Sequence, residues 1–201
     1  MKKWIFIALI LFAILCCLKP EYPQLQLLQQ AGTILLLIPL AVDLHKKAMP
    51  MSAYAGIACF TVLHIVGARY IYSYVPYREW ADSLGLHWDF LDSQRNCYDR
   101  LVHLGYGIFF FPYFVYLSRK WFCSKKWASL LIAWCIIQTG SLLYELFEWT
   151  LSIVMAPEDA ENYNGQQGDI YDAQKDMALA LLGSSAMFAL YSIRNLIRKH
   201  V

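Results

Sequence analysis

The distribution of apolar and polar positions along the chain predicts an all-α membrane protein. Six long apolar segments alternate with shorter stretches that carry most of the charge. A helix needs about 20 apolar residues to cross the hydrocarbon core of a bilayer, and the segments reach or approach that length. We therefore expect residues 1–201 to form one integral membrane domain, a polytopic bundle of six transmembrane helices. The predicted spans are Trp4–Leu18, Leu25–Val42, Met51–Val75, Tyr98–Leu117, Trp127–Leu151 and Ala173–Ile193.

The first apolar segment has two interpretations. Lys2 and Lys3 precede an apolar core of about the length found in secretory signals. No A-x-A cleavage site follows this core, and Leu15 before Cys16 does not fit a lipoprotein signal. We expect an uncleaved first span, and a cleaved signal is the alternative.

Composition supports the membrane class and excludes others. The chain is 59% hydrophobic and 16% charged, whereas soluble domains are about a quarter charged. Fourteen Tyr, eleven Phe and seven Trp suit the lipid headgroup region, so membrane lipid is the expected partner. No basic tract interleaved with aromatic residues and no Gly-rich phosphate loop occurs, which argues against nucleic acid as a partner. The six cysteines form no CxxC pair, so neither a disulfide framework nor a zinc finger is expected.

Lysine and arginine predict the orientation of the spans, because cytoplasmic loops of membrane proteins are enriched in both. Eleven basic residues lie at one end of the predicted bundle and three in the loops at the other. We therefore expect both termini to be cytoplasmic. The eleven are Lys2, Lys3, Lys46, Lys47, Arg119, Lys120, Lys125, Lys126, Arg194, Arg198 and Lys199, and the three are Lys19, Arg78 and Arg95.

Two loops at the outer end are long enough to cover it. Residues 77–91 place Trp80, Leu84, Trp88 and Leu91 at helical spacing, which predicts a short amphipathic segment in the membrane interface. The loop Ala156–Gly168 is acidic and rich in Asn, Gln and Gly, so we expect it to be mobile.

Three pairs of ionisable residues stand at the outer ends of the last three spans. Each pair is three or four residues apart and so shares one helix face. Ionisable groups inside a bilayer are costly and usually mark a functional site. Because the first two segments contain no acid, we expect them to be peripheral to the functional bundle. The pairs are Asp99 and His103, Glu145 and Glu148, and Asp172 and Asp176.

The residue types of these pairs predict a cation site. One histidine among many carboxylate oxygens favours Mg, Mn or Ca over Zn, so all six residues are candidate metal ligands. His103 is the candidate general base or ligand, with Asp99 and Glu145 as its candidate catalytic partners. Arg69 and Arg100 are candidates for binding an anionic part of the substrate.

Three strings in the chain resemble a known family. YDRLVH at Tyr98–His103, YELFEW at Tyr144–Trp149 and GDIYDAQKDMALALLG at Gly168–Gly183 are similar to the YjdF family of bacterial inner-membrane proteins. That resemblance implies a multi-pass protein of the inner membrane. Their order and spacing resemble, more distantly, the VanZ-like membrane proteins linked to glycopeptide-antibiotic resistance. The positions matching the VanZ-like pattern are Asp99, Arg100, His103, Glu145, Asp172, Asp176 and Gly183, while Glu148 and Asp176 stand where VanZ-like chains more often have amides.

Three functions fit this pattern. The first is a carboxylate and histidine pocket facing the outer leaflet, which binds a divalent cation and acts on a cell-envelope or lipid-linked substrate. The second is a small cation- or proton-coupled transporter, although the acidic pairs cluster at the outer face without a counterpart in the cytoplasmic half and no inverted repeat is visible. The third is a non-catalytic membrane scaffold. Whether the protein is an enzyme is left open by the sequence.

Overall fold

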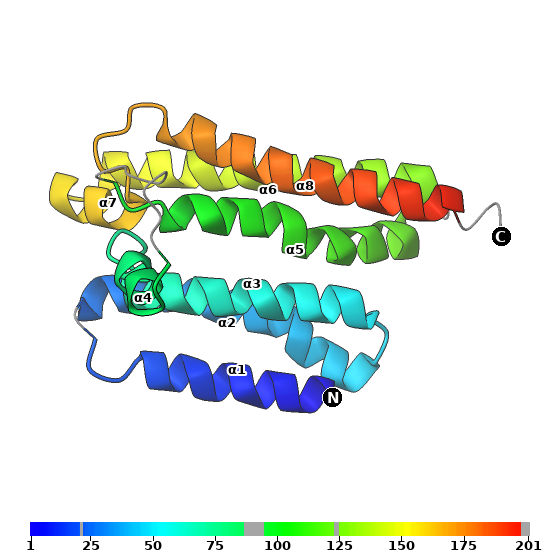
Figure 1. The fold of residues 1–201 in the computed structure, drawn as a ribbon, viewed down its shortest axis with the longest axis horizontal. Helices are drawn as coiled ribbons and strands as arrows, with labels where there is room; N and C mark the ends of the chain where they lie inside the picture. Colours follow the sequence, from blue (N-terminus) through cyan, green and yellow to red (C-terminus); the bar gives the residue numbers. More distant parts are fainter. Residues whose placement is uncertain (21, 87–94, 123–124, 198–201) are drawn as a thin grey trace.

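The computed structural model describes residues 1–20, 22–86, 95–122 and 125–197, and in these ranges the chain forms helices and no strand (Figure 1). The predicted all-α class is therefore confirmed. The helices are α1 (Lys2–Cys16), α2 (Pro23–Lys46), α3 (Met51–Arg69), α4 (Tyr77–Ser83), α5 (Tyr98–Trp121), α6 (Lys126–Val154), α7 (Pro157–Asn164) and α8 (Asp172–Ile197).

Five of the helices that the structure describes, α2, α3, α5, α6 and α8, are long and apolar enough to cross a membrane. The first predicted span corresponds to α1, which has 15 residues. At 1.5 Å per residue α1 is about 22 Å long, shorter than the roughly 30 Å hydrocarbon core. The fold therefore establishes a multi-pass helical bundle, whereas the sixth span stays a prediction.

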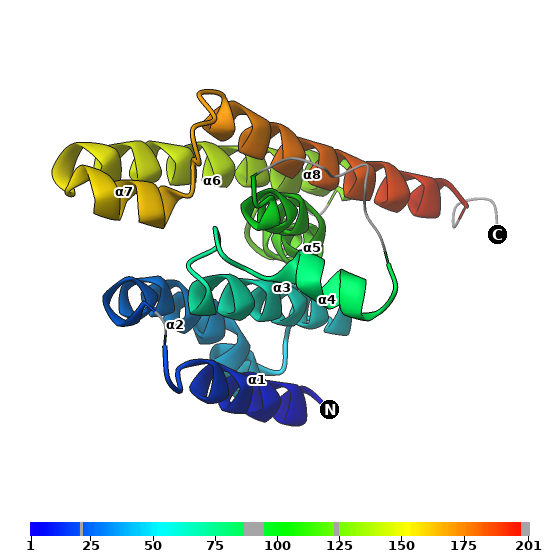
Figure 2. The same cartoon turned by 60° about the vertical axis from the view of Figure 1, so that its left-hand side comes forward.

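The chain runs up and down the bundle, so successive long helices are antiparallel neighbours (Figure 1). Helices α1, α2 and α3 form one half, and α5, α6 and α8 form the other (Figure 2). Helix α5 joins the halves, because it packs against α3, α6 and α8. The first residues of α1 and the last turn of α8 lie at one end of the bundle, and α4 and α7 lie at the opposite end (Figure 1).

Glycines let α5 and α8 approach until their backbones touch. A Cβ atom placed on Gly107 would lie 2.4 Å from the Ala180 carbonyl oxygen, and one on Gly183 would lie 2.5 Å from the Leu104 oxygen. No side chain fits in such a space. Ala180 and Gly183 lie three residues apart on one face of α8, and small residues at such positions let a neighbouring helix approach closely. This contact fixes the first turns of α5 and α8, which carry four of the candidate site residues, side by side.

Two predicted segments differ from the structure. The third span does not continue to residue 75, because α3 ends at Arg69 and the next residues turn back. Ile71 and Tyr72 have positive φ angles of 44° and 58°, and this turn directs the Tyr72 ring against Gly67 of α3. The predicted mobile loop 156–168 contains the helix α7. Of the predicted amphipathic segment 77–91, the structure describes α4 and the turn after it, whereas Trp88 and Leu91 lie outside the described residues.

Hydrogen bonds attach α1 to the rest of the bundle. The Lys2 ammonium lies 2.6 Å from an Asp43 carboxylate oxygen at the end of α2. At the other end of α1, the Gln26 amide and the Arg69 guanidinium donate to the Cys16 carbonyl at 2.8 and 2.7 Å. Arg69 also donates to the Leu18 carbonyl at 3.0 Å. Arg69, a candidate for binding an anionic part of the substrate, thus makes a helix-capping contact at the end of α1.

Candidate functional site

The three acidic pairs converge at the end of the bundle that carries α4 and α7. Ligand atoms of His103, Glu145 and Asp176 lie within 4.8 Å of one another, and so do those of Asp99, Asp172 and Asp176. Asp176 belongs to both groups and therefore links them. Five of the six predicted ligands are thus brought together, from three helices that are adjacent in the fold.

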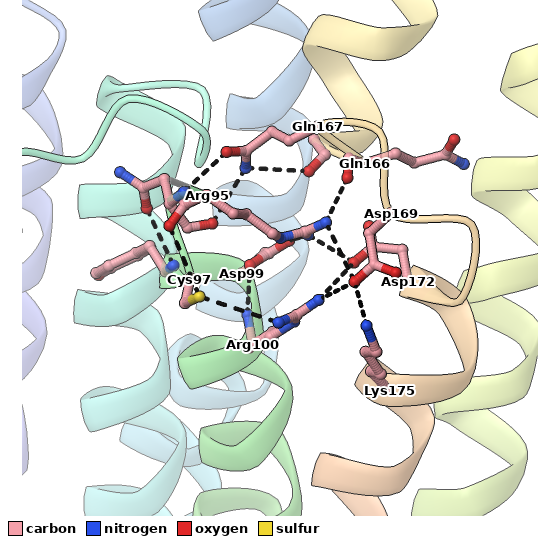
Figure 3. Close-up of polar contacts among 12 residues, drawn as sticks. Arg95, Cys97, Asp99, Arg100, Gln166, Gln167, Asp169, Asp172 and Lys175 are labelled. Carbon is pink, nitrogen blue, oxygen red and sulfur yellow. Dashed lines mark hydrogen bonds and ion pairs between the residues drawn. The ribbon is translucent and has the colours of Figure 1, made fainter. Parts of the chain in front are cut away.

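The residues nearest the end of the bundle form a layer of ion pairs, drawn in Figure 3. We call it the ion-pair layer, and it combines three cations with three carboxylates. Its charges therefore balance without a ligand. Its members are Arg95, Asp99, Arg100, Asp169, Asp172 and Lys175.

Arg95 is the centre of the ion-pair layer. Its guanidinium pairs with Asp99 on α5 and lies 2.5 Å from an Asp172 oxygen on α8. The same group donates to the carbonyl of Gln166, so it also attaches the loop that precedes α8 (Figure 3). Burial alone lowers the pKa of Arg95, but the Asp99 and Asp172 carboxylates outweigh it and raise this pKa above its ordinary value. Sequence reasoning missed this residue, because it counted Arg95 only as a loop charge.

Asp169 forms ion pairs with the other two cations of the ion-pair layer. The Lys175 ammonium lies 2.6 Å from an Asp169 oxygen, and the Arg100 guanidinium pairs with the same oxygen. Arg100 also lies 3.7 Å from Asp172. The hydrogen bond from Lys175 is the largest cause that lowers the pKa of Asp169 to about 2. Arg100, which was predicted to bind an anionic substrate, is therefore already paired with carboxylates of its own chain.

A second group of residues adjoins the ion-pair layer and has no balancing cation in the described part of the chain. We call it the deep layer: His103, Glu145, Glu148 and Asp176. His103, Glu145 and Asp176 lie about one turn deeper, and Glu148 lies nearer the end of the bundle. Glu145 and Asp176 are 7% and 3% exposed, and each has a buried carboxylate oxygen without a hydrogen bond among the described residues. The His103 Nε2 atom lies 3.5 Å from Glu145, too far for a strong hydrogen bond. Within the described part of the chain, no Lys or Arg forms an ion pair with these three carboxylates.

A cavity of about 310 Å³ adjoins the deep layer. Asp99, His103 and Glu148 line this cavity, whereas Glu145 and Asp176 are not among its lining residues. The other lining residues are largely aromatic or small. They are Gln29, Gly32, Leu35, Leu36, Phe60, His64, Tyr72, Val102, Tyr106, Phe110, Gly140, Ser141, Tyr144, Tyr163 and Asn164.

The first half of the chain contributes one wall of this cavity. His64 on α3 donates from Nε2 to the Gln29 carbonyl at 3.1 Å, and its Nδ1 accepts a hydrogen bond from the Tyr72 hydroxyl. Gly32 leaves room for the imidazole, because a Cβ there would lie 2.7 Å from the ring. Helix α2 therefore helps to build the site, and the expectation that the first two segments are peripheral is wrong for the second of them.

Comparison with known proteins agrees with the membrane fold. A family described as "Predicted membrane protein (DUF2238)" matches residues 1–196. The chain belongs to this family. The inner membrane protein YjdF of Escherichia coli (strain K12) is 33% identical to this DUF2238 chain over 138 residues, which cover 65% of the chain and 60% of YjdF. The match thus spans less than two thirds of its relative, and no solved structure matches the chain.

These findings confirm the YjdF-like resemblance and assign the DUF2238 chain to the multi-pass proteins of the inner membrane. The VanZ-like resemblance stays a prediction. The family description states no reaction, so the function must be inferred from the site itself.

Proposed function

We propose that this DUF2238 protein binds a divalent cation with His103, Glu145 and Asp176 and acts there on a cell-envelope or lipid-linked substrate. One observation carries the proposal. Two buried carboxylates, each with an oxygen that has no hydrogen bond within the described part of the chain, converge with an imidazole, and their ligand atoms lie within 4.8 Å of one another. Several ionised carboxylates do not remain together in a low dielectric without a positive charge, and a divalent cation would supply it.

The surrounding residues narrow the ligand set. Asp99 and Asp172 already pair with Arg95, so they are less available to a cation than the carboxylates of the deep layer. The three remaining ligands provide two carboxylates and one imidazole, a mixture that suits Mn or Mg. His103 also lines the cavity, so it lies between the cation position and any substrate. That place fits either a ligand or a general base.

A thermal unfolding experiment tests the proposal. Adding Mn or Mg should raise the unfolding midpoint of the detergent-solubilised protein, since a ligand at 100 times its dissociation constant stabilises by about 2.7 kcal/mol. Glu145→Gln and Asp176→Asn should abolish most of this shift. Both should also raise the midpoint measured without metal, because each removes one of the uncompensated charges.

Two matched controls accompany these variants. Asp159→Asn changes an exposed acid on α7, and Asp169→Asn changes an acid of the ion-pair layer. Both should retain the response to metal. If wild type and all four variants respond alike, there is no cation site in the deep layer.

We further propose that the end of the bundle carrying α4 and α7 faces away from the cytoplasm. The basic residues of the loops concentrate at the end that holds the first residues of α1 and the last turn of α8. In a cysteine-free background, an impermeant maleimide applied to right-side-out vesicles should label Asp159→Cys and spare Lys46→Cys, both exposed positions. Labelling of the second alone would reverse the orientation.

A further inference from the structure

The cavity changes from polar to apolar along its length. Asp99, Glu148 and Asn164 line it near the end of the bundle, while Phe110 and Leu36 line it deeper. Along α5, residues 99 to 110 span about 16 Å at 1.5 Å per residue. The polar end therefore lies near the predicted headgroup level and the apolar end in the hydrocarbon region. This gradient matches that of a lipid lying parallel to the helices.

The cavity also opens sideways. Leu35 on α2 and Tyr144 on α6 both line it, and they are 66% and 39% exposed. Helix α2 packs on α1 and α3, while α6 packs on α5, α7 and α8. Leu35 lies about 18 Å from the first residue of α2, and Tyr144 about 15 Å from the last residue of α6. The opening between these helices therefore faces the hydrocarbon core, where an acyl chain can enter.

The charge at the polar end of the cavity indicates which lipid headgroup would bind there. Among the described residues, no Lys or Arg lines the cavity, because Arg95 and Arg100 are held in the ion-pair layer. Glu148 reaches the cavity and has no ion pair within the described part of the chain. Several aromatic rings line the cavity together with this carboxylate, and aromatic faces attract ammonium groups. They are Tyr72, Tyr106, Tyr144, Tyr163 and, deeper, Phe60 and Phe110.

We propose that the cavity binds an amphiphile with a positively charged amine headgroup, which enters from the bilayer between α2 and α6. The ammonium lies against Glu148 and the tyrosine rings, and the hydrocarbon chain lies along Phe110 and Leu36. This inference rests on the proposed function only in taking the cavity as the substrate site. The sequence predicted that arginines bind an anionic part of the substrate. Because Arg69 caps α1 and Arg100 pairs with Asp169, we assign a cationic headgroup instead.

Binding of three soluble probes to the full chain in nanodiscs tests this assignment. The probes are octyltrimethylammonium, octyl phosphate and tetramethylammonium, each titrated below its micelle concentration and followed by calorimetry. Octyltrimethylammonium should bind at least about tenfold more tightly than octyl phosphate, because only the former complements Glu148. It should also bind at least about tenfold more tightly than tetramethylammonium, which lacks the apolar part.

Two substitutions test separately the contact with the Glu148 charge and the entry of the probe between α2 and α6. Glu148→Gln keeps the shape of the side chain, and it should weaken octyltrimethylammonium about tenfold while leaving octyl phosphate unchanged or slightly stronger. Leu35→Trp places a larger ring at the opening and should weaken both octyl probes. Asp159→Asn is the matched control and should change neither affinity.

Equal or tighter binding of octyl phosphate would overturn the cationic headgroup. Equal binding of tetramethylammonium and octyltrimethylammonium would overturn the amphiphile. An unchanged affinity in Glu148→Gln would overturn the assigned contact. None of these results affects the metal response of Glu145→Gln and Asp176→Asn, so a failure here is distinguishable from a failure of the proposed cation site.

Discussion

Replacing Arg95 by methionine should lower the free energy of unfolding by about 3–5 kcal/mol, as expected when one member of a buried ion-pair network is removed. The Arg95, Asp99 and Asp172 side chains are 9%, 12% and 7% exposed. Methionine fills much of the same volume but leaves both carboxylates without their main partner. Denaturant unfolding in detergent would measure the loss.

Two comparisons show whether the loss comes from these charges. Lys175→Met removes a cation from the same layer whose side chain is 49% exposed, and it should cost less than about 1 kcal/mol. Adding Asp172→Asn to Arg95→Met should recover part of the stability, because it removes one of the orphaned charges. Equal costs for the two cations, or strictly additive effects in the double variant, would show that Arg95 does not hold the layer together.

The second large effect is expected at the contact between α5 and α8. Gly183→Val should destabilise the protein by about 3 kcal/mol or more, because its side chain would have to occupy the space of the Leu104 carbonyl. The helices would separate and carry Asp99 and His103 away from Asp172 and Asp176. The variant should therefore have a lower free energy of unfolding and should no longer be stabilised by metal. A denaturant titration with and without Mn would measure both.

The control for this substitution lies on the same helix. Ala189 is exposed, so Ala189→Val enlarges a side chain that faces lipid or detergent and should leave both properties unchanged. Wild-type stability of Gly183→Val would contradict the close backbone approach of α5 and α8.

Hydrophobicity and spacing predicted the parts of this protein that depend on local sequence. The apolar segments located the long helices, because the bilayer demands length and apolarity from each span by itself. The pairs on the last three spans were expected at one depth, because alternating spans bring their ends to the same surface. Glu145 and Asp176, both predicted as ligands, are buried in the structure.

Features that depend on tertiary contacts were missed. Arg95 was read as a loop charge, since nothing local shows that its guanidinium lies between α5 and α8. The turn at Tyr72 was read as continued helix, because its apolar neighbours fit a span equally well. The wall formed by α2 was missed for a similar reason. Gln29 and Gly32 carry no charge, and their part in the cavity follows only from the position of His64 on α3.

The most direct test of the cation site is a count of bound metal. Wild-type protein and Asp159→Asn, equilibrated with Mn and freed of unbound ions on a desalting column, should retain about one Mn per chain by elemental mass spectrometry. The double variant Glu145→Gln/Asp176→Asn should retain almost none, and anomalous scattering from crystals should place the ion beside His103. A wild-type protein that keeps no metal, or a double variant that keeps as much as wild type, would contradict the proposed site.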